Sequence, residues 1–287
     1  MTGTPPTLDP ARYKEMARQQ WDNAADAWHK WIPVVRRWAG PATALMLDLA
    51  RIGPGSRVLD IAAGDGDQSL TAAQRVGPSG YVLATDIAPA LVAIAARVFR
   101  EAGLKNVEAR AMDAEELTVE DASFDAVISR FGFFFLPNLP KALLQIHRAL
   151  KPGGRISALV FSTPEKNPFL SVPISVIRRR AQLPPPLPGQ PGPLSLGAPG
   201  VLQDAFAKAG FRDVQSHNVA APLRMASAAE CVQWERESFA GLQQMLVGLN
   251  KVDQQEVWRE IESELAKYGS ARGFESPCEV IVGVGIK

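Results

Sequence analysis

Residues Arg57 to Asp67 read RVLDIAAGDGD, and this stretch decides the fold. A short apolar run ends at the carboxylate Asp60, and a tight turn with Gly64 and Gly66 follows it. The next segment, Gln68 to Arg75, has the pattern of a helix. Glycine has no Cβ, so the backbone can approach a ligand closely, and the free N–H groups of a helix start can bind it. The stretch therefore predicts a strand–turn–helix unit that holds a nucleotide-type cofactor.

Strand and helix patterns alternate from this unit to Phe161, with a helix at Asn138–Leu150. The further strands expected in this region are Gly80–Thr85, Val107–Ala111, Phe124–Ser129 and Arg155–Phe161. Such alternation predicts an α/β fold, in which helices cover both faces of a mostly parallel sheet. A β-branched run at Glu279–Ile286 is expected to pair at the edge of this sheet.

Helical patterns precede and follow the alternating region. We expect an N-terminal helical cap over residues 1–50, with helices at Pro10–Trp31 and Pro41–Arg51. The main domain then covers residues 51–287. Within it, residues 163–200 form a proline-rich lid or loop, and residues 224–270 form a helical insertion that opens on a capping-box spacing.

The composition excludes several classes of protein. The 287 residues are 46% hydrophobic and 21% charged, with a net charge of +1, which gives no general attraction to nucleic acid. No run reaches the ~20 apolar residues of a membrane span, and the first ten residues lack the pattern of a signal peptide. The two cysteines, Cys231 and Cys278, have no metal-ligand spacing, so we expect a cytoplasmic protein without a metal site.

The charge of the glycine turn distinguishes between cofactors. Asp60, Asp65 and Asp67 place three carboxylates around it, and these would repel the pyrophosphate of a dinucleotide. The turn also lacks the third glycine of the dinucleotide fingerprint. S-adenosylmethionine carries a sulfonium and an ammonium group and no phosphate. The acidic turn therefore favours S-adenosylmethionine over a nicotinamide cofactor.

Two more carboxylates follow later strands. Asp86 ends the second strand, where it can accept hydrogen bonds from both ribose hydroxyls. Asp113 follows the third strand, in a position to bind the adenine amino group, with Met112 against the ring. Either aspartate taken alone could instead cap the N-terminus of a helix.

The segments VLDIAAGDGD, ATDIAP, AMDAEEL, FDAVISRFGFFFLPN and RALKPGGR have the order and spacing of a known family. In them the chain resembles the class I S-adenosylmethionine-dependent methyltransferases, especially the group of the ubiquinone and menaquinone C-methyltransferases (UbiE-like). The resemblance is strong over Arg51–Phe161 and looser beyond it. It implies a Rossmann-like sheet of seven strands, the last of them antiparallel, and an enzyme that transfers a methyl group.

The resemblance also implies which residues bind the cofactor. Asp60 and the turn at Gly64 and Gly66 would hold the methionine part, and Ser129 and Arg130 would lie beside the sulfonium. The remaining residues implied at the cofactor are Asp86 at the ribose, with Ile87 next to it, and Met112, Asp113 and Ala114 at the adenine. The chain departs from the family at Ala62, where many members have the first glycine. One methyl group is small, so we expect cofactor binding to be kept in spite of the altered contact at Ala62.

Methyl transfer is an in-line displacement, which requires mainly that the acceptor is aligned and water is excluded. A general base is needed only if the acceptor must lose a proton. The candidates are His29 in the cap and His217 near the strand after Gly210, with Tyr13 as a weaker one. Each of these side chains has a structural alternative, and His147 has the pattern of a packing residue.

Aromatic residues indicate the acceptor. Phe131 and Phe134 follow the fourth strand, where the family places its substrate, and Tyr13, Trp21 and Trp28 lie in the cap. They favour a small apolar or aromatic acceptor, methylated at carbon or oxygen or also at nitrogen, in quinone-type or secondary-metabolite biosynthesis. The protein would be a monomer or a homodimer. Two alternatives remain open: a protein of this fold that transfers no methyl group, and an NAD-dependent oxidoreductase.

Overall fold

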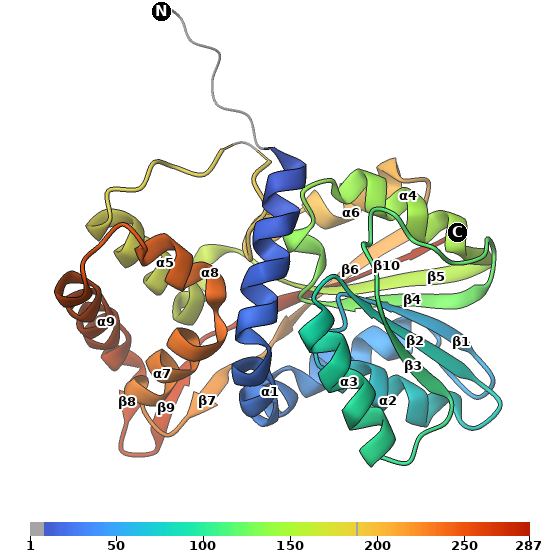
Figure 1. Cartoon of the computed structure of the whole chain (residues 1–287), viewed down its shortest axis with the longest axis horizontal. Coiled ribbons are helices and arrows are strands. Elements are labelled where there is room, and N and C mark those ends of the chain that lie inside the picture. The colour runs from blue at the N-terminus through green and yellow to red at the C-terminus, as the bar shows by residue number, and fades with distance from the viewer. Residues whose placement is uncertain (1–8, 188) are drawn as a thin grey trace, which may run out of the picture.

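The computed structural model describes residues 9–187 and 189–287, so the first residues, where no signal peptide is expected, lie outside it. Its centre is a seven-stranded sheet with the order β3-β2-β1-β4-β5-β10-β6 (Figure 1). The strands are β1 (Arg57–Ile61), β2 (Tyr81–Asp86), β3 (Val107–Ala111), β4 (Phe124–Arg130), β5 (Leu150–Phe161), β6 (Arg212–Ala220) and β10 (Glu279–Ile286). Only β10 runs antiparallel to its neighbours in this sheet. The predicted mostly parallel sheet with an antiparallel last strand is confirmed.

The expected place of the last strand is wrong. β10 lies inside the sheet, where Val280 pairs with Phe161 of β5 on one side and with Val219 of β6 on the other. Its central residues, Val280 to Gly285, are buried, so the strand has no free edge and no solvent-facing side. β6 takes the edge instead, because its alternating exposed residues suit a strand that faces water on one side.

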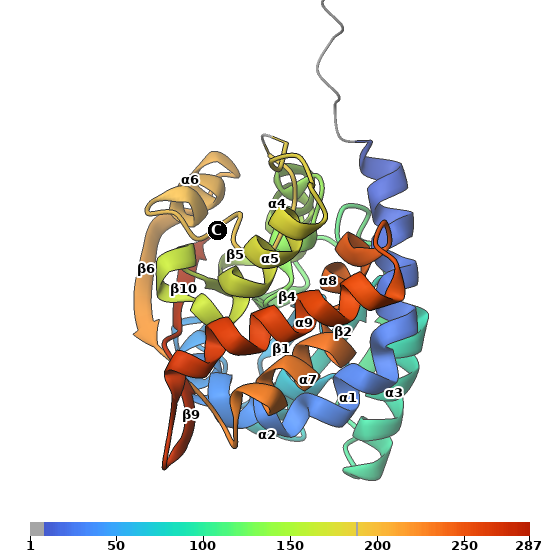
Figure 2. The ribbon, with the colours of Figure 1, turned by 90° about the vertical axis from the view of Figure 1, so that its left-hand side faces the viewer.

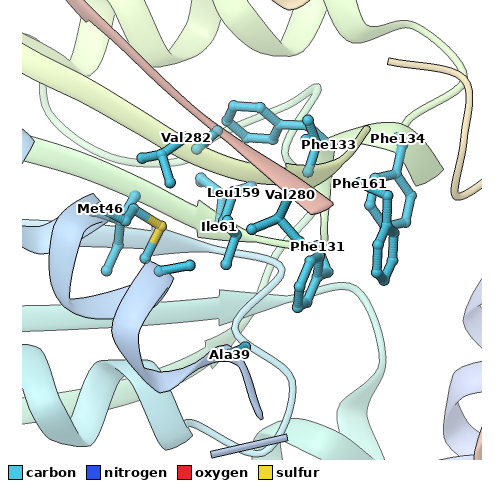
Figure 3. Packing of buried hydrophobic residues seen from close by; sticks show 14 of the residues in the cluster. Ala39, Met46, Ile61, Phe131, Phe133, Phe134, Leu159, Phe161, Val280 and Val282 are labelled. Atoms are coloured by element: carbon cyan, nitrogen blue, oxygen red, sulfur yellow. The ribbon is translucent and has the colours of Figure 1, made fainter. Parts of the chain in front are cut away.

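Helices cover both faces of the sheet, as predicted. α2 (Asp67–Val76) and α3 (Pro89–Glu101) lie on one face, and α4 (Leu139–Ala149) and α6 (Val201–Lys208) lie on the other (Figure 1). Between the layers, Met46, Ile61, Leu159 and Val282 belong to one continuous apolar core (Figure 3). These helices hold the strands rigidly, so the loops at the carboxyl ends of the strands have fixed positions.

The N-terminal region is one helix rather than two. α1 (Pro10–Leu49) continues through Pro33 and Pro41, although proline lacks the N–H that a helix interior needs. Both proline rings are exposed, and packing on the other face outweighs their cost. The side chains that pack there recur at helical spacing and are buried: Val35, Ala39, Ala42 and Met46.

A helical layer covers the far side of α1. It consists of α5 (Pro168–Arg180), α7 (Ala228–Ser238), α8 (Ala240–Leu246) and α9 (Lys251–Leu265). A small antiparallel sheet of β7 (Leu223–Met225), β9 (Gly273–Ser276) and β8 (Gly269–Ser270) extends it, which the sequence did not predict. Figures 1 and 2 show α1 between this layer and α3.

The capping box predicted before α7 is confirmed, since the Ser227 side chain accepts a hydrogen bond from the Glu230 N–H at 3.1 Å. Between α5 and α6, residues 183–187 and 189–199 form neither helix nor strand, as their proline content predicts. Among the described helices, none has an apolar stretch of the length that a membrane crossing requires.

Candidate functional site

The turn after β1 has an unusual backbone. Ala62 has φ +54°, Gly64 has φ +60°, and Gly66, which begins α2, has φ +84°. A Cβ on Gly66 would lie 2.6 Å from the Phe99 ring, so only glycine fits there. Ala62 adopts the left-handed conformation in spite of its methyl group, which strains the backbone. A glycine at position 62, as the resemblance implies for this turn, would adopt this conformation without strain.

The loop after β4 packs directly against this turn. Phe131 also has a positive φ, +60°, and a Cβ on Gly132 would lie 2.5 Å from the Ala62 Cβ and 2.7 Å from Ser129 Oγ. The chain order of the strands reverses between β1 and β4. Ligands of open α/β sheets bind at such a switch point, outside the carboxyl ends of the strands. Two strained loops meet at the place where the fold binds ligands.

Asp60 connects β1 to α2. Its side chain is fully buried and accepts hydrogen bonds from Ser69 Oγ at 2.5 Å and Gln68 Nε2 at 3.2 Å. Burial raises the pKa of this carboxyl to about 7. Asp60 therefore connects the end of β1 to the first turn of α2, and both of its carboxylate oxygens accept hydrogen bonds from side chains of that helix.

Asp86 and Asp113 lie at the ends of neighbouring strands. Asp86 accepts hydrogen bonds from the Gly64 N–H at 2.9 Å and the Ala88 N–H at 3.0 Å, and burial raises its pKa. Asp113 accepts one from the Glu115 N–H at 2.8 Å and pairs with Lys14 Nζ of α1 at 2.7 Å. Both aspartates thus accept hydrogen bonds within local turns, and neither caps a helix, since α3 begins after Ala88 without a side-chain cap. Asp86 also connects its loop to the glycine turn.

The other residues expected at the ribose and the adenine lie around these two aspartates. Ile87 follows Asp86 directly, and the Met112 N–H donates a hydrogen bond to the Asp86 carbonyl at 2.8 Å. Ala114 is buried beside them. The structure therefore brings the expected ribose and adenine residues to one edge of the sheet, beside the glycine turn.

Arg130 has a charged partner. Its guanidinium lies 2.9 Å from Asp67 Oδ2, and both side chains are buried. Arg36 of α1, which is 59% exposed, reaches the other oxygen of Asp67 at 2.7 Å. A free guanidinium would repel a sulfonium, and the pairing with Asp67 removes that repulsion.

Two buried polar atoms near the turn have no partner among the described residues, namely Asp65 Oδ1 and Ser129 Oγ. The other oxygen of Asp65 lies 2.8 Å from Nδ1 of His29, and burial raises the pKa of this carboxyl. Buried polar groups are normally satisfied, so orphaned ones mark a place for a ligand. A carboxylate oxygen and a hydroxyl suit the ammonium end of S-adenosylmethionine, so the residues present fit this cofactor.

Aromatic side chains gather next to these loops. Phe131 stacks on Phe161 with ring centroids 4.6 Å apart and on Trp38 of α1 at 5.4 Å. The Phe134 ring lies 5.8 Å from that of Phe161 and 6.5 Å from that of Phe131, and Figure 3 shows the three side chains together. Phe131 and Phe134 thus belong to one aromatic cluster beyond β4, and Phe135 connects it to Trp21 of α1, with ring centroids 4.7 Å from Phe134 and 5.5 Å from Trp21.

The expected acceptor residues of the cap, Tyr13, Trp21 and Trp28, lie on α1 before Trp38. Trp28 packs edge-on against Trp21 at 5.6 Å, and its Nε1 lies 3.2 Å from the position of a Gly64 Cβ. Tyr13 is partly buried, and burial raises its pKa to about 12. A raised pKa lowers the fraction of phenolate at neutral pH, which disfavours Tyr13 as a general base.

The structure does not bring His217 to this site. It lies on β6, separated from β1 by β4, β5 and β10, which corresponds to about 19 Å at ordinary strand spacing. His147 packs edge-on against Phe211 at 5.2 Å, as a packing residue would. Of the three histidines, only His29 contacts the glycine turn.

Sequence reasoning missed the contacts that α1 makes with the loops. Lys14 reaches Asp113, His29 reaches Asp65, and Trp38 joins the aromatic cluster. Their spacing along the helix is irregular, so no pattern marks them. The only available signal was the unusual tryptophan content of the region.

Comparisons with known proteins agree with this geometry. A family model described as a methyltransferase domain matches residues 58–154. The chain is 32% identical to the nocamycin O-methyltransferase of Saccharothrix syringae over 68% of this chain and 72% of that protein. It is 41% identical to the ubiquinone/menaquinone biosynthesis C-methyltransferase UbiE of Hydrogenovibrio crunogenus over 40% of this chain, which spans about half of that protein (46%).

Among solved structures, the [4+2]-cyclase SpnF matches with a TM-score of 0.58 at 18% identity over 95% of both chains. A likeness at this level of identity concerns the fold alone, since one fold hosts different functions.

Proposed function

Because this chain belongs to the S-adenosylmethionine-dependent methyltransferase family, we propose that it methylates a small, largely apolar or aromatic acceptor at carbon or oxygen. Nitrogen is a further possible position, and quinone-type or secondary-metabolite biosynthesis is the expected setting. The observation that carries the acceptor class is the aromatic cluster of Phe131, Phe134, Phe161 and Trp38 directly beyond β4. Flat apolar walls of this kind bind aromatic molecules through dispersion and ring stacking.

The cofactor would lie along the carboxyl ends of β1 to β4. Asp86 would accept hydrogen bonds from the ribose hydroxyls, Asp113 would accept one from the adenine amino group, and Ile87, Met112 and Ala114 would flank the ring. Asp65 Oδ1 and Ser129 Oγ, the two orphaned atoms, would bind the ammonium end. The bound cofactor supplies an electrophilic methyl group on a positively charged sulfur.

The protein's own part in the reaction is alignment and exclusion of water. The aromatic cluster orients the acceptor, and α1 covers the loops through Lys14, Trp28 and His29. An apolar enclosure strengthens the attraction between the acceptor's lone pair and the sulfonium. His29 is already hydrogen-bonded to Asp65, so its role would be to position the Asp65 carboxylate and the glycine turn.

We extend the proposal to the whole chain. Residues 1–50 and 224–270 would enclose the acceptor, and residues 163–200 would form the rim through which it enters. The enzyme would work in the cytoplasm as a monomer or a homodimer.

Calorimetric titration with S-adenosylmethionine, S-adenosylhomocysteine and NAD tests this function. We expect the first two ligands to bind, and Asp86→Ala to weaken them about 10-fold or more, because charge-assisted hydrogen bonds are worth ~1.5–3 kcal/mol each. Asp26→Ala, at an exposed position of α1, is the matched control. Circular dichroism checks that Asp86→Ala still folds, since Asp86 also accepts two backbone N–H groups.

Acceptor screening then uses phenols, quinones and indoles with S-adenosylmethionine. Methylation of any of them supports the proposal. Cofactor binding without turnover of any acceptor would identify a protein of this fold that transfers no methyl group. Binding of NAD alone would identify an oxidoreductase.

A further inference from the structure

One face of α7 is buried and polar at the same time. Cys231, Trp234, Glu235 and Ser238 recur at spacings of three and four residues, and each is 0% exposed. Gln233 on the opposite side is exposed. Helices normally direct apolar side chains inward, so a carboxyl and a hydroxyl on the buried face need an explanation.

Several polar atoms of this face have no hydrogen-bond partner among the residues that the structure describes. The buried side-chain atoms without a hydrogen-bond partner among residues 9–187 and 189–287 are Asp65 Oδ1, Ser129 Oγ, His217 Nε2, Trp234 Nε1, Glu235 Oε2 and Ser238 Oγ. Half of them lie within two turns of α7, and two others lie at the cofactor loops. Native proteins leave few such atoms, so their concentration at one helix face indicates a second place for a ligand.

The local contacts of Glu235 do not satisfy it. Its other oxygen receives only the weak thiol donor of Cys231, with Sγ 3.8 Å from Oε1. Burial raises the pKa of Glu235 well above its ordinary value. Burial thus favours the neutral carboxyl, which can both donate and accept a hydrogen bond.

The α7 face adjoins the aromatic cluster. The Trp234 ring lies 5.9 Å from that of Trp38 and 6.2 Å from that of Phe169, and Trp38 stacks on Phe131 at 5.4 Å. Two ring-to-ring contacts thus connect the loop after β4 to α7. A flat acceptor lying along these rings would have one end near β4 and the other near Glu235.

We propose that Glu235, together with Ser238 Oγ and Trp234 Nε1, binds a hydroxyl group on the far end of an aromatic or enolic acceptor. This inference rests on the proposed function and adds the chemical class of the acceptor: a flat molecule with a hydroxyl group. A ligand hydroxyl both donates and accepts, so it can satisfy the Glu235 carboxyl and one neighbour together. An acceptor without it would leave these groups buried and unpaired, which is how a site rejects an analogue that lacks the hydroxyl.

The test compares wild type with Glu235→Met, which keeps the volume but removes the polar atoms. The probes are phenol, 2-naphthol and 2-anthrol, each paired with its hydrocarbon parent. They are titrated by calorimetry in the presence of S-adenosylhomocysteine, so no turnover occurs. We expect wild type to bind at least one hydroxylated probe about 10-fold or more tightly than its parent. Glu235→Met should abolish this preference and raise Tm by several degrees, because the orphaned carboxyl is gone.

Two further variants complete the design. Glu235→Gln keeps a donor and an acceptor and should retain most of the hydroxyl preference, whereas Gln233→Met on the exposed side should change neither affinity nor Tm. A lower Tm in Glu235→Met with an unchanged preference would show a purely structural role and overturn the proposal. So would equal affinities, or no binding, across all probe pairs in wild type.

S-adenosylmethionine titrated in the same proteins keeps the two hypotheses apart. Wild type that fails to bind it would refute the proposed function. Retained cofactor binding without any hydroxyl preference would refute only the role of Glu235.

Discussion

Single residues at the ends of β1 and β4 decide how closely two loops approach. Gly132 has no side chain, and a methyl group there would collide with the Ala62 Cβ at 2.5 Å. Ala62 in turn holds a left-handed backbone conformation that favours glycine. Gly132 therefore has no room for a side chain, and Ala62 carries a methyl group in a backbone conformation that favours glycine.

This contact gives a prediction for stability. Gly132→Ala should lower the free energy of unfolding by about 1–3 kcal/mol, the usual cost of overpacking. Adding Ala62→Gly should recover part of the loss, because it removes one of the colliding atoms and the strain. Urea denaturation measures both, with Gly53→Ala as control, since a Cβ there meets nothing within 4 Å. If the changes in unfolding free energy caused by the two substitutions were additive, there would be no steric coupling between positions 62 and 132, which would contradict the prediction.

At the level of elements, α1 illustrates how packing overrides local preference. Its buried stripe continues past Pro33 and Pro41, so the helix stays whole where the sequence suggests a break. The same helix contacts the cofactor loops at positions from Lys14 to Arg36. From the middle of the helix, Lys30 and Trp31 both bind Glu237 of α7 at 2.6 Å. A continuous α1 thus connects the cofactor side of the molecule to the helical layer.

The cost of a proline in this helix can be measured. Pro33 is exposed, and alanine there would restore a backbone N–H within the helix. Pro33→Ala should raise the free energy of unfolding by about 1 kcal/mol or more, towards the ~3 kcal/mol that separates the two residues in helix interiors. Pro10→Ala, at the first position of α1, should give no gain, because proline is favoured there. Destabilisation by Pro33→Ala would mean that the packing of α1 depends on a bend at Pro33.

The whole molecule concentrates buried carboxyls at one edge of the sheet. Asp60, Asp65 and Asp86 all have pKa values raised by burial, and that of Asp60 reaches about 7. Between its unfolded value near 4 and this value, the folded protein keeps a proton that the unfolded chain releases. Stability should therefore fall as pH rises through this window, and stay level above it.

Asp60→Asn tests this pH dependence. Between pH 4.5 and pH 7.5 the free energy of unfolding should fall less in this variant than in wild type. The difference between the two decreases is at most about 4 kcal/mol, because the pKa of Asp60 is raised by about three units and one unit corresponds to 1.36 kcal/mol. Urea denaturation at several pH values measures it, and the exposed Asp26→Asn should follow wild type. Parallel pH profiles of wild type and Asp60→Asn would contradict a raised pKa at Asp60.

Much of the fold was predictable from local sequence patterns. The strands from β1 to β5 and the helices between them were predictable because apolar runs, glycine turns and helical spacing act over a few residues. The placement of the expected cofactor residues at the carboxyl ends of the strands was predictable for the same reason, since each lies at or near the end of a strand. β10 was misplaced because pairing depends on residues far away in the chain, and α1 was divided because proline is a local signal that distant packing overruled.

The sequence by itself determined the order of the α/β units, the glycine turn and the acidic character of the cofactor loops, because these depend on neighbouring residues. Only the tertiary structure decided that His29 lies on Asp65 and His217 far from it, and that Trp38 and Trp234 extend the aromatic cluster. It also left Glu235 buried, with no partner for Oε2 in the described part of the chain. Burial and the absence of a partner are properties of the space around a side chain, which forms only when distant segments pack together.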